Sequence, residues 1–273
     1  MAVTIGAAEL RDRLATGEHL VLADVRPEAE WRRATIPGAI GLNVYDYFIP
    51  QSDEAGIAAM AGAAARAFSA AGIDGSVPVV HFEQATGMVS PRGLWFQEFL
   101  GLPGGRILDG GIDAWIASGG MTQPGTGPAL AVAGAEALPA PPAPRLDLVA
   151  TIGEVAGLDP GRTMLLDVRR RSEHEGSFVH PCCARPGRIP HSAFLFWEDL
   201  LDGGRYRPAA EIAAAAAAAG LSPDRRVITY CHRGARAATA LYALQLAGYR
   251  DVAVFVGSWH EWATRTDLPV ATG

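Results

Sequence analysis

The sequence predicts an α/β protein of two similar domains, each a mainly parallel β-sheet covered by helices on both faces. Short Val/Ile/Leu runs alternate with helical patterns, and a set of short motifs occurs twice in the same order. A stretch rich in Pro, Ala and Gly lies between the two copies. We therefore expect domains at residues 1–122 and 147–273, joined by a semi-rigid, unpacked linker at residues 123–146.

Four paired motifs carry the duplication, and chance rarely places four matches in one order. The pairs are Leu-Ala-Asp-Val-Arg at 22–26 with Leu-Leu-Asp-Val-Arg at 165–169, Ile-Pro-Gly-Ala at 36–39 with Ile-Pro-His-Ser-Ala at 189–193, the apolar run 77–82 with 226–230, and Gly-Gly-Ile-Asp-Ala-Trp at 110–115 with Gly-Ser-Trp-His-Glu-Trp at 257–262.

Within the second copy, apolar runs predict buried strands and the segments between them predict helices. An alanine-rich run favours a plain packed helix, because alanine has the highest helix propensity. The expected elements are strands at 164–168, 226–230 and 252–256, and helices at 208–219 and 237–247 that end before Gly220 and Gly248.

Composition excludes several classes of function. The net charge is -6 and all 23 basic side chains are arginine, so a general nucleic-acid binder is disfavoured. No apolar stretch approaches the length of a membrane helix, and the first residues lack a secretory pattern. Three cysteines are too few for a disulfide framework, which favours a reducing cytoplasm. We find no dinucleotide-binding or Walker motif and expect no cofactor.

The strongest chemical signal surrounds Cys231. A buried strand leads into this cysteine, then into a polar loop containing Gly234, then into an alanine-rich helix. The sulfur is thus expected at the carboxyl end of a parallel strand, where inward-turned amides and a helix N-terminus favour an anion. Arg233 and Arg236 add positive charge, so the pattern predicts a reactive thiolate more strongly than a buried structural cysteine.

The loop Cys-x-x-Gly-x-Arg at 231–236 resembles the active-site loop of the rhodanese family. The Asp-Val-Arg, Ile-Pro-Gly and Gly-Gly-x-x-x-Trp elements are similar to other landmarks of that family, and residues 257–262 resemble the ending of its two-domain sulfurtransferases. The resemblance covers nearly the whole chain. It implies two rhodanese-like domains, each with a five-stranded parallel sheet, of which the C-terminal one is catalytic and the N-terminal one degenerate.

The resemblance also implies a mechanism through a persulfide on Cys231. The expected donor is a small anion, and the basic loop favours thiosulfate over 3-mercaptopyruvate; the expected acceptor is cyanide or a thiol, with a protein acceptor also open.

Glu173 departs from the pattern, since animal-type members have a donor-binding arginine there. The expected substrate-binding loop is His232, Arg233, Gly234, Ala235, Arg236 and Ala237, with Arg233 and Arg236 as candidates for the donor's anionic end.

The first copy lacks the nucleophile. Glu83 stands where Cys231 stands in the second copy, and a carboxylate cannot carry a persulfide. The first domain is therefore predicted to be catalytically inactive and structural.

Two other functions are weighed against sulfur transfer. A cysteine phosphatase usually has five residues between its cysteine and arginine, whereas four lie between Cys231 and Arg236, so that function is disfavoured. A persulfide carrier that discharges only to a protein partner stays open. Turnover with a small acceptor distinguishes an enzyme from a carrier.

For three other features of the sequence, a structural role is favoured over a chemical one. Asp167 and Arg169 recur as Asp24 and Arg26 in the inactive copy, which favours a role in holding the sheet edge. The vicinal pair Cys182 and Cys183 has histidines nearby but no Cys-x-x-Cys spacing, so no metal is predicted. A surface loop without chemistry is favoured for the pair, and a relay that accepts sulfur from Cys231 is the next interpretation. Three tryptophans near the domain ends are expected to pack: Trp115, Trp259 and Trp262.

Overall fold

The computed structural model describes residues 3–134 and 144–273. The chain divides into two compact units, which are described separately here. The first contains the described residues of Met1–Tyr47, Ala58–Arg145 and Gly203–Tyr206, and the second contains Phe48–Ile57, Leu146–Asp202 and Arg207–Gly273. Neither unit is therefore one continuous stretch of chain.

The first unit is built on a six-stranded sheet with the strand order β1-β5-β4-β2-β3-β6, and every neighbouring pair is parallel. In this order, strands that are distant in the sequence lie next to each other in the sheet. Such parallel neighbours require helical crossover connections between them. The strands are β1 (Thr4–Ile5), β2 (Val21–Asp24), β3 (Ile40–Asn43), β4 (Val79–Phe82), β5 (Gly105–Leu108) and β6 (Leu130–Ala131).

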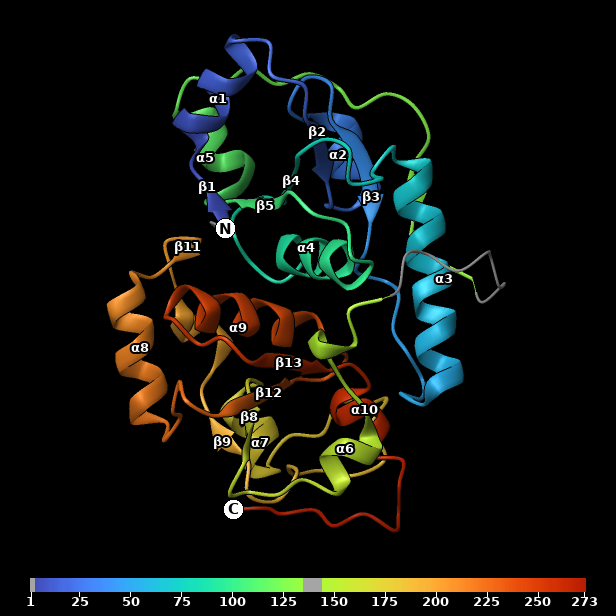
Figure 1. The fold of residues 1–273 in the computed structure, drawn as a ribbon, viewed down its shortest axis with the longest axis vertical. Coiled ribbons are helices and arrows are strands. Elements are labelled where there is room, and N and C mark those ends of the chain that lie inside the picture. Colours follow the sequence, from blue (N-terminus) through green and yellow to red (C-terminus); the bar gives the residue numbers. More distant parts are fainter. Residues whose placement is uncertain (1–2, 135–143) are drawn as a thin grey trace. The chain divides into compact units, whose positions relative to one another are not determined.

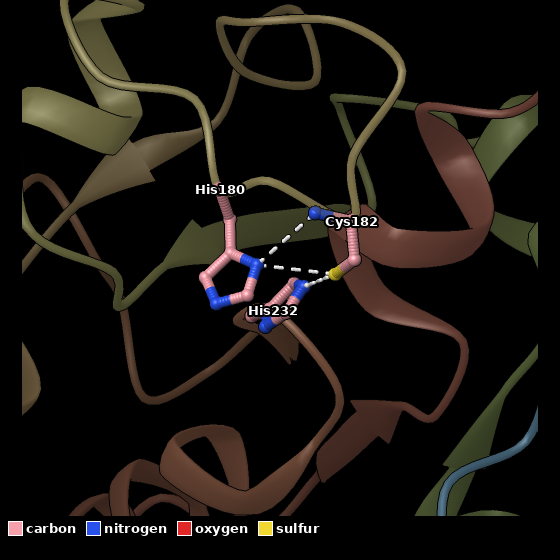
Figure 2. A group of neighbouring side chains, drawn as sticks. All are labelled: His180, Cys182 and His232. Carbon is pink, nitrogen blue, oxygen red and sulfur yellow. Dashed lines mark hydrogen bonds between the residues drawn. The ribbon is translucent and has the colours of Figure 1, made fainter.

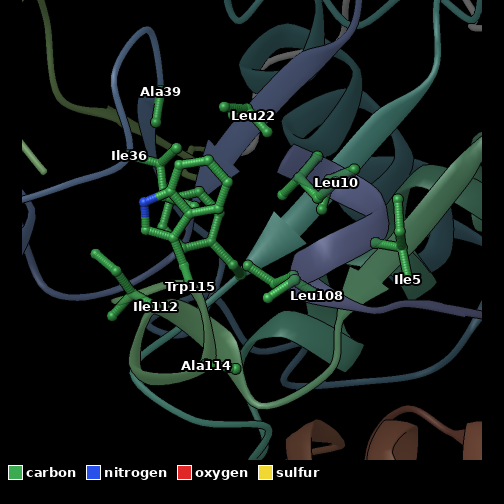
Figure 3. Close-up of a cluster of buried hydrophobic side chains, with 12 residues drawn as sticks. Ile5, Leu10, Leu22, Ile36, Ala39, Leu108, Ile112, Ala114 and Trp115 are labelled. Atoms are coloured by element: carbon green, nitrogen blue, oxygen red, sulfur yellow. The ribbon is translucent and has the colours of Figure 1, made fainter. Parts of the chain in front are cut away.

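Helices α1 and α5 lie together on one side of this sheet and α4 on the other (Figure 1). A core of buried side chains fills the space beneath α1 and α5, with Trp115, Leu10 and Leu108 among its members (Figure 3). The helices are α1 (Ala7–Ala15), α2 (Glu28–Arg33), α3 (Glu54–Ala70, whose residues 58–70 belong to this unit), α4 (Ser90–Phe99) and α5 (Gly111–Ala117), and β11 (Arg205–Tyr206) also belongs to this unit.

The second unit has a five-stranded parallel sheet in the order β7-β13-β12-β8-β9. Helices α8 and α9 cover one face, and α6 and α10 lie on the other (Figure 1). The elements are η1 (Leu146–Leu148), β7 (Val149–Ala150), α6 (Ile152–Ala156), β8 (Thr163–Asp167), α7 (Arg171–Glu175), β9 (Ala193–Phe194), η2 (Trp197–Leu200), β10 (Leu201–Asp202), α8 (Ala209–Ala218), β12 (Arg226–Tyr230), α9 (Ala235–Leu246), β13 (Val252–Phe255) and α10 (Ser258–Trp262).

The three tryptophans near the domain ends pack as predicted. Trp115 is buried in the first unit's core, and Trp259 and Trp262 are buried in the core beneath the second sheet. Large aromatic side chains contribute strongly to such cores because each removes a large apolar area from water.

The two-domain α/β fold is confirmed, with elements within two residues of the predicted bounds in the second copy. Gly220 and Gly248 follow α8 and α9 with positive φ, as C-terminal caps require. The first sheet has a sixth strand, β6, that the five-strand prediction lacked. It arises within the predicted linker, where Val132 donates its N–H to the carbonyl of Asn43.

The prediction of a wholly unpacked linker is therefore wrong for residues near β6. An extended segment exposes backbone N–H and C=O groups, and the edge strand β3 satisfies them. Residues 135–143 of the predicted linker lie outside the described residues. Within the described ranges, no helix is both long and apolar enough to cross a membrane.

Candidate active site

The site is organised by the connection between β12 and α9. Strand β12 ends at Tyr230, Cys231 follows, and Gly234 turns the chain with φ 92° into α9. Only glycine adopts this left-handed conformation without steric cost. The turn brings the N–H of Gly234 to 3.1 Å from the Cys231 sulfur, to which it donates. The sulfur thus lies at the carboxyl end of a central strand, where a loop amide points at it.

A second loop, after β13, holds the backbone of Cys231. The N–H of Cys231 donates to the Ser258 hydroxyl at 3.2 Å, and that hydroxyl donates to the Phe255 carbonyl. Trp259 donates its N–H to the carbonyl of Cys231. Ser258 has φ 52°, an uncommon conformation for a residue with a side chain. Ser258 was not singled out from the sequence, although it replaces a glycine of the first copy's motif at that position.

Arg236 forms a buried ion pair with Glu173. Its two terminal nitrogens donate to the two carboxylate oxygens at 2.8 and 3.2 Å. Burial alone would raise the pKa of Glu173, but the hydrogen bond and charge of Arg236 outweigh it and lower that pKa. Glu173 therefore stays ionised and neutralises much of the charge of Arg236. Glu173, at the position where the resemblance to animal-type members predicts a donor-binding arginine, is thus the partner of the loop arginine.

Arg233, the other arginine of the loop, contacts different residues from those of that pair. Its guanidinium stacks over the Phe48 ring at 4.0 Å and contacts the Cys182 sulfur at 3.3 Å. Phe48 belongs to the second unit despite its place in the first half of the sequence. A cation over an aromatic face is held in place while keeping its charge. Arg233 is therefore a positioned cation two residues from Cys231.

His232 completes the polar part of the loop. Burial, followed by the charges of His180 and Arg233, lowers the pKa of His232 to about 3. Its imidazole is therefore neutral at physiological pH, so the cationic character of the loop comes from its arginines.

Asp167 and Arg169 form a fully buried ion pair at 2.6 Å beneath the site. Tyr230 donates its hydroxyl to Asp167 at 2.9 Å, and His174 Nδ1 lies 2.9 Å from the same oxygen. Arg169 also donates to the Gly187 carbonyl. Burial would raise the pKa of Asp167, yet the charge of Arg169 and the hydrogen bonds from His174 and Arg169 lower it to about 2. The pair ties the ends of β8 and β12 to the segment that follows α7.

Cys182 and Cys183 have different surroundings. The Cys182 thiol is exposed and lies 3.1 Å from His232 Nε2, so it contacts the loop that carries Cys231. Cys183 is partly buried and packs against the core of the second unit. Burial, then the neighbouring Cys182, raises the pKa of Cys183 to about 12, which keeps it a thiol. The sequence placed these cysteines in a loop, but the contact with a residue fifty positions away was not predictable from spacing.

In the first unit, the Glu83 carboxylate lies in a pocket of amides at the equivalent position. One oxygen accepts N–H groups from Gly87, Val89 and Ser90 at 2.8 to 3.0 Å, and also the Ser90 hydroxyl. Burial raises the pKa of Glu83, and the hydrogen bonds, which lower it, offset only part of this increase. The carboxylate thus occupies the position where the other unit has a sulfur.

We expect Glu83→Ala to lower the free energy of unfolding of the first unit by about 2 kcal/mol, because buried amides lose their acceptor. Glu83→Gln keeps one acceptor oxygen and should lose less than half as much. Chemical denaturation of both variants measures the difference. Equal losses in the two variants would mean that the oxygen retained in Glu83→Gln contributes nothing, and that the hydrogen bonds to these amides are not the source of the stabilisation.

Comparison with known proteins agrees with this architecture. The family model described as "Rhodanese-like domain" matches residues 6–118 and 155–265. The chain is 30% identical, over 99% of its length and 97% of the relative's, to a "Putative thiosulfate sulfurtransferase SseB" of Mycobacterium tuberculosis. It is 32% identical to a "Probable 3-mercaptopyruvate sulfurtransferase" of Pseudomonas aeruginosa, over 71% of this chain and 68% of that protein.

A solved structure titled "Crystal Structure of Probable Thiosulfate Sulfurtransferase" superposes with a TM-score of 0.68. It is 27% identical and the match covers 93% of this chain and 97% of that one. With two domain matches that span most of the sequence, the chain belongs to the rhodanese family. The resemblance inferred from the loop, Asp-Val-Arg and closing motifs is therefore confirmed.

Proposed function

We propose that this protein is a sulfurtransferase that moves a sulfane sulfur from a small anionic donor to a thiophilic acceptor through a persulfide on Cys231. The observation that carries the proposal is the Cys231 sulfur at the end of β12, enclosed by a loop whose Gly234 amide points at it. Burial lowers the pKa of Arg236, but the negative charges of Cys231 and Glu173 outweigh burial, so this pKa is raised. Nucleophilic catalysis needs the thiolate, whose negative charge the Gly234 amide and the nearby guanidinium stabilise during the reaction.

The reaction has two half-reactions. In the first, the Cys231 thiolate attacks the outer sulfur of thiosulfate, a new S–S bond forms, and sulfite leaves with the electron pair of the broken bond. In the second, cyanide attacks the outer sulfur of the persulfide, and the Cys231 thiolate leaves as thiocyanate forms. The loop amides stabilise the negative charge at the persulfide's outer sulfur, as an oxyanion hole does for oxygen.

Thiosulfate is our favoured donor because Arg233 presents a fixed cation beside the nucleophile. The donor 3-mercaptopyruvate is the second candidate, and one observation favours it: Glu173 neutralises Arg236, so the loop is less cationic than its sequence indicates. Three free thiols suit a reducing compartment, and we propose the cytoplasm as the place of action.

The decisive experiment measures the intact mass of the protein after incubation with thiosulfate and, separately, with 3-mercaptopyruvate. We expect the gain of one sulfur atom on Cys231 and its loss after cyanide is added. The donor that loads faster identifies the substrate class. Absence of a mass gain with both donors contradicts the proposal. Loading without discharge to cyanide or small thiols would instead indicate a carrier that requires a protein acceptor.

Arg233→Gln tests how the donor is held. Removing a charge-assisted contact should raise KM for thiosulfate about tenfold while kcat changes little, because the nucleophile and its amides remain. Steady-state kinetics with cyanide as acceptor measure both constants. Arg250→Gln removes one exposed positive charge elsewhere in the same unit and is the matched control. An unchanged KM in Arg233→Gln would remove Arg233 from donor binding.

A further inference from the structure

Three side chains with metal-binding atoms gather beside the loop of Cys231: His180, Cys182 and His232 (Figure 2). The Cys182 sulfur lies 3.1 Å from His180 Nδ1 and 3.1 Å from His232 Nε2. All three ligand atoms lie within 4.8 Å of one another. His180 and Cys182 are exposed, and His232 is half-buried, so an ion in solution can reach the group.

Both imidazole contacts are compatible with hydrogen bonds, because a thiol can donate its hydrogen to one nitrogen while its sulfur accepts from the other. A thiol has a single hydrogen, so it can donate to only one of the two imidazoles. His180 Nδ1 also lies 3.4 Å from the Cys182 N–H, which makes this nitrogen an acceptor with its lone pair on the side of the cysteine. The geometry therefore directs the lone pair of His180 Nδ1 toward the cysteine, as metal coordination requires.

Two of the three spacings, those from the sulfur to each nitrogen, are close to the edge of a tetrahedral metal site. With a metal–sulfur bond near 2.3 Å and metal–nitrogen bonds near 2.0 Å, tetrahedral ligands lie about 3.5 Å apart. The observed 3.1 Å contacts are within a few tenths of an ångström of that edge. Small side-chain rotations suffice to admit an ion between the three atoms.

We propose that His180, Cys182 and His232 form a binding site for a thiophilic d10 cation, Zn²⁺ or Cu⁺. A thiolate with two imidazoles selects these ions over Mg²⁺ or Ca²⁺, which prefer oxygen ligands. Three protein ligands leave a fourth position open.

Two neighbouring groups fit this assignment. Arg233 Nη2 lies 3.3 Å from the Cys182 sulfur, where its N–H can donate to a metal-bound thiolate. His260 is next to the group, with its ring 5.8 Å from that of His232, and its Nδ1 is buried with no hydrogen-bond partner among the described residues. His260 is therefore a candidate hydrogen-bond partner for an added fourth ligand.

The site joins two segments with different roles. His180 and Cys182 lie in the segment after α7, and His232 directly follows Cys231 in the loop. An ion here fixes the His232 side chain and engages Arg233 through the metal-bound thiolate, which withholds this guanidinium from the donor. Occupancy should therefore slow sulfur transfer, and this consequence rests on the proposed function. Binding itself does not depend on it.

Binding is tested with the full-length, reduced, metal-free protein. We expect calorimetry with Zn²⁺ to give one site per chain, and Co²⁺ to produce a thiolate charge-transfer band that reports a cobalt–sulfur bond. Cys182→Ser and His180→Asn should each weaken Zn²⁺ binding at least about tenfold and remove the band. Both side chains are exposed, so these changes should leave the melting temperature nearly unchanged. Competition with Cu⁺ under reducing conditions shows which of the two ions binds more tightly.

Matched controls make the outcome specific. Cys183→Ser, His191→Asn and Cys231→Ser keep all three ligands and should bind Zn²⁺ like the unaltered protein. Absence of binding, or binding that survives Cys182→Ser, overturns the inference. Loss of binding only in Cys231→Ser would place the ion on the nucleophile and overturn it equally.

Rates of sulfur transfer with and without metal distinguish a failure of the metal site from a failure of the proposed function. Equimolar Zn²⁺ should lower the rate of sulfur transfer severalfold and a chelator should restore it, whereas Cys182→Ser, relative to its own metal-free rate, should not respond. Sulfur transfer without metal binding refutes only the metal site. Metal binding at these three residues without sulfur transfer refutes only the proposed function.

Discussion

Cys231→Ser is expected to reduce sulfur transfer by at least about a thousandfold, because a hydroxyl cannot form or carry the persulfide. Cys231 is 1% exposed and serine is nearly the same size, so the fold should be retained. The Gly234 amide would then donate to the serine oxygen in place of the sulfur. The measurement is thiocyanate formation from thiosulfate and cyanide, together with the melting temperature.

Cys183→Ser is the matched control for that change. It removes a thiol whose high pKa keeps it protonated and which packs in the core, and the rate should stay close to that of the unaltered protein. Substantial residual transfer in Cys231→Ser would mean that another cysteine is the nucleophile. Cys182, which contacts His232, would then be the first candidate, and Cys231→Ser/Cys182→Ser would be inactive.

The part of the site that sequence could predict is the part that is local. A strand, a cysteine, a glycine turn and a helix follow one another between residues 226 and 246, so their geometry is dictated by neighbouring dihedral angles. The duplicated motifs likewise predicted two α/β domains, because each motif lies at a strand end or a helix start. Elements and topology of this kind follow from periodicity and chain order.

The parts that were missed depend on residues distant in sequence. Glu173 and Arg236 are 63 positions apart, and only the pairing of β8 with β12 brings the segments after these strands together. A signal did exist: opposite charges just beyond two parallel strands are expected to meet at one sheet edge. Ser258 and Phe48 gave no such signal, since one is a small polar residue and the other an ordinary aromatic.

The buried pair Asp167 and Arg169 should have the largest effect on stability. Arg169→Met leaves a buried carboxylate without its counter-charge, and we expect the free energy of unfolding of the second unit to fall by about 3–5 kcal/mol. Asp167→Asn/Arg169→Met removes both charges and should recover part of that loss. Denaturant unfolding of the single and double variants gives the coupling energy.

The same pair predicts how stability depends on pH. The pKa of Asp167 is lowered from 3.8 to about 2 in the folded state, so the unfolded chain binds its proton first as the pH falls. The stabilisation, roughly 2 kcal/mol, is complete above pH about 4 and is lost between pH about 4 and about 2. Asp167→Asn/Arg169→Met should lack this acid-sensitive part of the stability curve.

Arg26→Met is the internal control, since Asp24 and Arg26 form the same buried pair in the first unit at 2.6 Å. We expect it to destabilise that unit while the acid-sensitive step of the second remains, because Asp167 keeps its bonds to Arg169, His174 and Tyr230. If Arg169→Met cost under about 1 kcal/mol, the pair would not hold the sheet edge. The recurrence of Asp-Val-Arg in a domain with no cysteine nucleophile would then need another explanation. A large cost at both sites would mean that the motif is retained in each unit for folding, independently of sulfur chemistry.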